Sequence, residues 1–262
     1  SRKATPIRQH IEADQALLDS TRTEIRDVSL RYQGLSKAGQ AVPDSIRRYE
    51  AGTVWKLGKK YENQIYLLER KERDLTFDMT RLRMREGAAK RRALPWVVVD
   101  TPYVFETPRG HRALAELFAG RSQLVVYHFM YGPDWKQGCP HCSFWADNFD
   151  GIDVHLAHRD LALVAVSRAP LAKIEDFKRR MGWTFKWVSS SGSDFNYDFG
   201  ASFTDEQRKS GKALFNYRPE DPGFADREGA SFFFRDPRGR IFHTYSTYAR
   251  GIDLLNGAYN FL

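Results

Sequence analysis

Two cysteines three positions apart are the residues of this chain best suited to chemistry. Cys139 and Cys142 are the only cysteines in the sequence, and they stand in KQGCPHCSFWADNF, residues 136–149. Thiols at this spacing serve in thiol–disulfide exchange or as two of the four ligands of a zinc ion. A zinc site usually needs a second such pair, but none follows, and His155 and His158 lack an accompanying carboxylate signature. The pattern therefore favours redox chemistry over a metal site or two incidental thiols.

The residues around the pair predict which thiol attacks. An apolar run precedes the pair and a helical pattern follows it, so Cys139 is expected at the start of a helix, with Pro140 in the first helical position. Unpaired N–H groups and the partial positive charge at a helix start favour a thiolate, and His141 acts in the same direction. Such surroundings lower a cysteine pKa from about 8.5 to between ~3.5 and 7.5. We therefore expect Cys139 to be the nucleophile, His141 to tune it and Cys142 to resolve the mixed disulfide.

Four further side chains are candidates for supporting roles. Asp134 could relay a proton to Cys142 or be an ordinary turn aspartate, and Trp135 could form a wall of the thiol pocket. His128, in an otherwise apolar strand, either points toward the site or forms a hydrogen bond in the core. Arg168 follows a predicted strand at the sheet edge where α/β folds bind ligands, so it could bind an anionic substrate or pair with an acid.

The residues from Leu94 onward show the alternation of short apolar runs and helical stretches that is typical of an α/β domain. Strands are predicted over 94–100, 102–110, 122–132 and 161–170, and a hairpin that turns at DPRG over 229–251. Helices are predicted over 111–120, 142–160, 171–183 and 251–262. The strand 122–132 is almost entirely apolar, as a central strand covered on both faces would be, and the cysteine pair follows its end.

Residues 1–93 have a different character. They carry 21 Lys and Arg against 13 Asp and Glu, whereas residues 94–262 carry 20 of each sign, so the whole net charge of +8 belongs to this part. Two heptad patterns on either side of the breaker-rich stretch 34–44 predict a coiled-coil hairpin of two helices, about 30 and 45 residues long. The charges alternate in sign, and only KRR at 90–92 forms a basic cluster. We therefore expect a solvated arm for docking or homodimerisation rather than for nucleic-acid binding.

The composition is that of a folded chain, whose 42% apolar residues can form one sizeable core. No run of 18 or more apolar residues occurs, so no membrane span is expected. The segment SGSDFNYDFG lacks the spacing of a phosphate-binding glycine loop. The N-terminal residues lack the apolar stretch of a secretory signal, which favours a cytoplasmic protein and leaves a processed periplasmic protein as the alternative.

Several long strings resemble a known family. ALPWVVVD, LVVYHFMYGPDWKQGCPHCSFWADNFDG, LVAVSRAPLAKIEDFKRRMGW, SSSGSDFNYDFG and FHTYSTYARGIDLLNGAYNFL are similar to bacterial uncharacterised thioredoxin-like proteins, labelled predicted dithiol-disulfide oxidoreductases, over residues 94–262. The resemblance implies an α/β thioredoxin-like fold to which this chain adds a long N-terminal α-helical hairpin. It also implies thiol–disulfide exchange with a protein or small-thiol substrate. Electrons would come from another dithiol protein or glutathione, so no bound cofactor is implied.

The resemblance leaves the substrate and the reaction class open. Thioredoxin-fold enzymes place a cis-proline before the strand that faces the cysteines, but this chain has Gly229 and Ala230 before SFFFRD, so Ala230 is the expected substrate-facing residue. A peroxiredoxin-like thiol peroxidase is an alternative, although Lys136 stands where such enzymes have the threonine of Thr-x-x-Cys. A further alternative is a non-catalytic interaction module whose hairpin dimerises or holds a partner.

Overall fold

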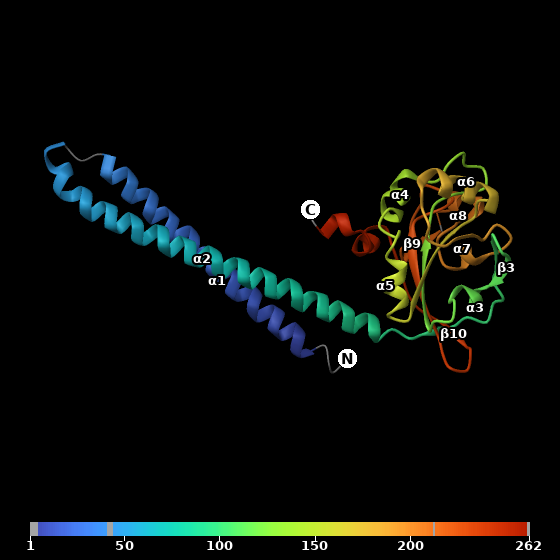
Figure 1. The fold of residues 1–262 in the computed structure, drawn as a ribbon. Coiled ribbons are helices and arrows are strands. Elements are labelled where there is room, and N and C mark those ends of the chain that lie inside the picture. The colour runs from blue at the N-terminus through green and yellow to red at the C-terminus, as the bar shows by residue number, and fades with distance from the viewer. Residues whose placement is uncertain (1–4, 41–43, 212, 261–262) are drawn as a thin grey trace. The chain divides into compact units, whose positions relative to one another are not determined.

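The computed structural model describes residues 5–40, 44–211 and 213–260 (Figure 1). The chain divides into two compact units between Ala93 and Leu94. The first unit is helical and the second contains all the strands. Within the described parts of the chain, no helix combines the length and the apolar character that a bilayer span needs.

The first unit is a hairpin of two long helices, α1 (Thr5–Gln40) and α2 (Asp44–Arg92). Helix α1 is longer than predicted because it continues through Gly34. A single glycine costs a helix only about 1 kcal/mol, which the neighbouring helix-forming residues offset. Residues 41–43, which also belong to the stretch expected to separate the two helices, lie outside the described residues.

Helices α1 and α2 pack against each other along the hairpin. The most deeply buried apolar side chains on it are those of Leu18, Val28, Leu68 and Met79. Thr21 is also buried at this contact, and its hydroxyl donates to the carbonyl of Leu17, so the polar group is not left unpaired. Arg22 and Glu72 form an ion pair between the helices, with 2.7 Å between Nε and Oε1. The heptad patterns also include Tyr32, Leu35 and Val54, whose side chains lie outside the described part of the structure.

The second unit is built on an eight-stranded sheet with the order β1-β10-β9-β4-β5-β6-β2-β3. Its strands are β1 (Val97–Val98), β2 (Val104–Thr107), β3 (Gly110–Ala113), β4 (Gln123–His128), β5 (Leu161–Ser167), β6 (Trp187–Ser189), β9 (Gly229–Arg235) and β10 (Ile241–Tyr248). A separate pair is formed by β7 (Leu214–Phe215) and β8 (Arg218–Pro219). The helices are α3 (Leu114–Leu117), α4 (Pro140–Ala146), α5 (Asp153–Ala157), α6 (Leu171–Met181), α7 (Phe195–Asp198) and α8 (Asp205–Lys209), followed by the 3₁₀ helices η1 (Ala249–Leu255) and η2 (Gly257–Asn260).

Four central strands have the order and directions of the thioredoxin fold. Strand β4 runs parallel to β5 on one side and antiparallel to β9 on the other, and β9 pairs antiparallel with β10. Helix α4, which contains the second cysteine, connects β4 toward β5, and α6 follows β5. The second unit is therefore an α/β thioredoxin-like domain, and the chain adds an N-terminal helical hairpin to it, as predicted.

The side chains of the central strands alternate between two cores, one on each face of the sheet. Val125 and Tyr127 of β4 belong to the cysteine-side core, which also contains both cysteines and side chains of α6. Leu124 and Val126 belong to the far-side core, which contains side chains of α3 and α7. The strand that precedes the cysteine pair is thus covered on both faces, which fixes the position from which the pair emerges.

Three predicted helices need correction. Residues 110–113 form β3, which pairs with β2 after a tight turn, so only 114–117 of the segment 111–120 are helical. The segment 142–160 is divided between α4 and α5, because Gly151 adopts a positive φ of 80° that interrupts a helix. The C-terminal segment forms η1 and η2 instead of one α-helix, with Asn256 in an extended conformation between them.

Candidate functional site

The cysteine pair lies where β4 passes into α4. Cys139 is the N-cap residue of α4 and Pro140 is the first residue of the helix, as predicted. The backbone of Met130 holds both cysteines, because its carbonyl accepts from the N–H of Cys139 (3.1 Å) and its N–H donates to Sγ of Cys142 (3.4 Å). Gly138 allows this approach, since a Cβ there would lie 2.8 Å from the ring of Phe129. The two sulfurs are therefore positioned by backbone contacts to the strand end.

The two thiols have opposite acidities. The hydrogen bond from the Cys142 thiol is the largest influence on Cys139, and together with backbone N–H groups and His141 it lowers the pKa of Cys139 to about 6 despite partial burial. Burial raises the pKa of Cys142 well above its ordinary value, because a thiolate there would be desolvated. At neutral pH the pair is therefore a thiolate at Cys139 and a thiol at Cys142. An anion next to a hydrogen-bond donor is the arrangement expected of an attacking and a resolving cysteine.

A cavity of about 680 Å³ opens onto the pair. Cys139 and Cys142 both line it, although only 7% and 1% of their surfaces are exposed. Its aromatic wall consists of Tyr127, Trp135, Phe144, Trp145, Phe224 and Tyr259. The charged side chains that line it are Arg227, Glu228, Arg250 and Asp253. The cavity therefore gives a small molecule a route to the sulfur of Cys139.

The predicted tuner His141 and the supporting candidate Trp135 lie at the cavity, and Asp134 does not. His141 lines the cavity and has an exposed side chain, from which its charge lowers the pKa of Cys139 as the smallest of the named influences. Trp135 also lines the cavity, half-buried, as predicted for a wall. Asp134 is exposed and does not line the cavity, and the ordinary turn aspartate describes it better than a proton relay to Cys142.

His128 and Arg168 are engaged elsewhere. His128 faces the far-side core, where it stacks against Phe195 and its Nε2 lies 2.8 Å from Oγ of Ser231. Burial lowers the pKa of His128 to about 3, so the ring is neutral. Arg168 forms a half-buried ion pair with Asp226, 2.6 Å between Nε and Oδ1. Its guanidinium thus pairs with an acid, the second of the two predicted alternatives.

The expectation for Ala230 also needs correction. Ala230 is completely buried in β9, in register with Tyr127 of β4 and Thr247 of β10. Its backbone belongs to the sheet, and it does not line the cavity. The residues that reach the cavity at this corner are Arg227 and Glu228, immediately before β9. No peptide bond among the described residues is cis.

Sequence reasoning missed Tyr127 and the distant walls of the cavity. Tyr127 is completely buried, and its hydroxyl finds no nitrogen or oxygen partner. Burial raises the pKa of Tyr127 well above its ordinary value, and a hydrogen bond with Cys142 and the charge of Glu228 act in the same direction. A hydroxyl in an apolar strand is a weak signal for such a residue, because strand tyrosines usually serve packing. Phe224 and Tyr259 follow the cysteines by more than 80 positions, and the sequence carries no local signal that brings them there.

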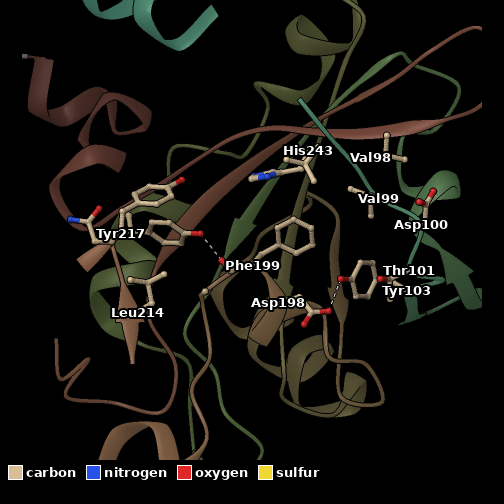
Figure 2. A pocket seen from close by; sticks show the side chains of 14 residues that line it. Val98, Val99, Asp100, Thr101, Tyr103, Asp198, Phe199, Leu214, Tyr217 and His243 are labelled. Atoms are coloured by element: carbon tan, nitrogen blue, oxygen red, sulfur yellow. Dashed lines mark hydrogen bonds between the residues drawn. The ribbon is translucent and has the colours of Figure 1, made fainter. Parts of the chain in front are cut away.

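A metal is not indicated by the described residues, among which no three His, Cys, Asp or Glu side chains gather as potential ligands. A second cavity, of about 360 Å³, is lined by β1 and by the residues of Figure 2. In it the Tyr103 hydroxyl donates to Asp198 and the Tyr248 hydroxyl donates to the carbonyl of Phe199, and the donor–acceptor distance is 2.5 Å in both hydrogen bonds. Neither cysteine lines this cavity.

Comparisons with known proteins give no specific function. Similar solved structures include a cysteine-to-serine mutant of PrxQ from Xylella fastidiosa (15% identity, 60% of this chain and 88% of that chain, TM-score 0.38). Another is the peroxidoxin BcpB from Mycobacterium tuberculosis (15% identity, 63% of this chain and 95% of that chain, TM-score 0.39). A third is a thiol:disulfide interchange protein from Bacteroides sp. (14% identity, 64% of this chain and 90% of that chain, TM-score 0.36). These TM-scores are below 0.5, so the assignment of the fold depends on the strand order described above. No curated protein sequence matches the chain.

A family model extends the sequence resemblance. It matches residues 59–262, so the match begins inside α2 and includes part of the helical hairpin, which the resemblance over 94–262 left out. The model describes bacterial proteins of unknown function (DUF899). Because it covers well over half of the chain, the protein belongs to this bacterial family.

Proposed function

We propose that the protein is a thiol–disulfide oxidoreductase in which Cys139 attacks and Cys142 resolves. The observation that carries the proposal is the difference between the two thiols: Cys139 is a thiolate at the wall of a cavity, whereas Cys142 is a buried thiol that donates a hydrogen bond to it. Two incidental cysteines would not need opposite acidities at the mouth of a cavity. Perturbed pKa values of this kind concentrate at functional sites.

The reaction would proceed in two exchanges. In the first, the Cys139 thiolate attacks one sulfur of a substrate disulfide, a Cys139–substrate disulfide forms, and the other half of the substrate leaves as a thiolate. In the second, Cys142 loses its proton and attacks Sγ of Cys139, which forms the Cys139–Cys142 disulfide and releases the remaining substrate half as a thiolate. The protein gives up two electrons and the substrate gains them. An external dithiol returns the pair to the reduced form, and no bound cofactor takes part.

The trapped intermediate tests this assignment. Reduced Cys142→Ser should accumulate a mixed disulfide on Cys139 when mixed with bis(2-hydroxyethyl) disulfide, and mass spectrometry of the intact protein detects the adduct. The reduced wild-type protein should instead end with the internal disulfide and no adduct, and Cys139→Ser should give neither product at a comparable rate. An adduct found on Cys142, or equal reactivity of Cys139→Ser, contradicts the roles.

Rates of peroxide consumption and of disulfide exchange, measured on the same protein, separate the alternative functions. A thiol peroxidase would consume hydrogen peroxide far faster than it exchanges with disulfides, whereas we expect the reverse order. A non-catalytic interaction module would be inert in both assays. The homodimer predicted through residues 1–93 is a separate proposal, and sedimentation of the full chain against a chain with a charged residue at the exposed Phe77 of α2 tests it.

A further inference from the structure

The charged side chains of the cavity beside Cys139 are paired with one another. Arg227 forms an ion pair with Glu228 (3.3 Å), and its Nη1 donates to the carbonyl of Pro222 (2.6 Å). Arg250 forms an ion pair with Asp253 (2.8 Å). Both guanidinium groups are thus engaged by carboxylates of the chain itself, and the remaining basic side chain of the lining, His141, is exposed and acts on Cys139. Desolvating an unpaired carboxylate in such a cavity is costly.

The rest of the wall is aromatic and is assembled by the C-terminal segment. The indole N–H of Trp145 donates to the carbonyl of Ile252 (3.0 Å), which ties η1 to α4. The ring of Tyr259 lies 5.6 Å from that of Trp145 and 5.7 Å from that of Phe144. The amide of Asn148 donates to Asn256 (3.1 Å) and its side-chain oxygen accepts from the N–H of Gly257 (3.0 Å). These bonds fix η1 and η2 beside α4 and turn the surface next to Cys139 into a concave site.

An extended peptide has no strand edge to join at this site. Strand β9, which begins at the cavity, lies between β4 and β10 and pairs with both. Recognition of a chain by β-strand addition needs free backbone N–H and C=O groups. Tyr127 also lines the cavity, but its hydroxyl is completely buried and acts on the Cys142 thiol, so it gives a peptide backbone no partner.

We infer that the cavity selects small, uncharged disulfides and thiols with apolar substituents, and excludes glutathione-like anions and extended protein chains. The inference rests on the proposed function and adds the substrate class to it. Apolar substituents would be buried against the aromatic wall, and each additional buried methylene is expected to accelerate exchange by about fourfold.

Four aliphatic disulfides of similar intrinsic reactivity test the selection: diethyl disulfide, dipropyl disulfide, bis(2-hydroxyethyl) disulfide and oxidised glutathione. Each is mixed with the reduced full-length protein, and formation of the internal disulfide is followed by acid quenching and mass spectrometry. Each rate is divided by the rate of the same disulfide with dithiothreitol, which removes intrinsic reactivity. We expect dipropyl disulfide to exceed diethyl disulfide by about fourfold for each substituent buried in the cavity, and to exceed bis(2-hydroxyethyl) disulfide by about tenfold, and we expect oxidised glutathione to be slowest.

A matched pair of variants locates the selection in the cavity. Phe224 lines the cavity and is 58% exposed, so Phe224→Ser removes apolar wall without disturbing the core. It should lower the preference for dipropyl over bis(2-hydroxyethyl) disulfide at least about threefold. Leu254 lies on η1 and is 71% exposed, but it does not line the cavity. Leu254→Ser should therefore leave the preference unchanged.

The outcomes separate the two proposals. If none of the four disulfides oxidises the cysteine pair, the proposed function fails. If all of them react but oxidised glutathione has the highest normalised rate, or if the two variants change the preference equally, the oxidoreductase stands and the inferred substrate class is wrong.

Discussion

The acidity of Cys139 is the property on which the chemistry most depends, and replacing Cys142 tests its origin. The hydrogen bond from the Cys142 thiol is the largest influence that lowers the pKa of Cys139 to about 6. Cys142→Ala removes the donor and leaves Cys139 partly buried. We therefore expect the pKa of Cys139 to return toward the ordinary value of about 8.5. Cys142→Ser keeps an O–H donor at the same place and should give an intermediate value.

The choice of assay follows from the magnitudes. A rise of the pKa from about 6 to about 8.5 lowers the thiolate fraction at pH 7 about thirtyfold. The more basic thiolate is also about tenfold more nucleophilic, since nucleophilicity rises with pKa with a coefficient of about 0.4–0.5. The alkylation rate at pH 7 would thus fall only about threefold, too little to read alone. The pH at the midpoint of iodoacetamide labelling, by contrast, reports the pKa directly.

One outcome would show that the hydrogen bond between the cysteines does not set the acidity of Cys139. If Cys142→Ala labels with a midpoint that stays near 6, the helix start and His141 control the acidity, and the hydrogen bond between the cysteines does not. Single-cysteine labelling also removes the ambiguity of two thiols, because Cys139 is then the only cysteine in the chain. Cys139→Ser should show no labelling below about pH 9, because the pKa of Cys142 is raised by burial.

Three further predictions concern the pair and its support. The reduction potential should fall by about 59 mV per pH unit below pH 6, where reduction takes up two protons, and by about 30 mV per unit above it, where Cys139 stays a thiolate; a single slope from pH 5 to 8 contradicts the lowered pKa. Tyr127→Phe should slow release of the second substrate thiol in the single-turnover assay, because the Tyr127 hydroxyl lowers the pKa of Cys142 against the larger effect of burial. The labelling midpoint of Cys139 should stay unchanged, and an unchanged release rate rules this role of Tyr127 out. Asp226→Asn should reduce the free energy of unfolding by about 3–5 kcal/mol, because it leaves the half-buried Arg168 without its charged partner, and urea denaturation showing a loss under about 1 kcal/mol would speak against a structural role for the pair.

The corner that holds the cysteines could be predicted because its signals are local. A continuous apolar run indicates a strand buried on both faces, and the proline after Cys139 indicates a helix start, so the order strand, cysteine, helix follows from about 20 neighbouring residues. The hairpin at DPRG was equally accessible, since Asp236 accepts from the N–H groups of Arg238 and Arg240 within the turn itself. Such features depend on contacts between residues close in sequence.

The walls of the site could not be predicted because their contacts are distant in sequence. Arg168 follows a strand at a sheet edge where ligands bind in many α/β folds, and only the fold shows that Asp226, 58 positions later, occupies its guanidinium. The same applies to Ala230, whose place in the sequence matches a substrate-binding position but whose backbone is committed to β4 and β10. The segment 142–160 has a continuous helical pattern, and a glycine with positive φ divides it. Tertiary contacts and one backbone conformation override local preference in each case.

The thiolate at Cys139 contributes less to the direction of electron flow than its acidity suggests. Lowering the pKa from about 8.5 to about 6 stabilises the reduced pair about tenfold at pH 7, which raises the reduction potential by about 30 mV. Known reductants and oxidants with this fold differ by about 150 mV, so the thiolate accounts for about one fifth of that range. The thiolate mainly makes Cys139 reactive at neutral pH, to any disulfide that reaches it. Discrimination between substrates then has to come from access to Cys139, which Phe224, Tyr259 and the paired charges of the cavity control.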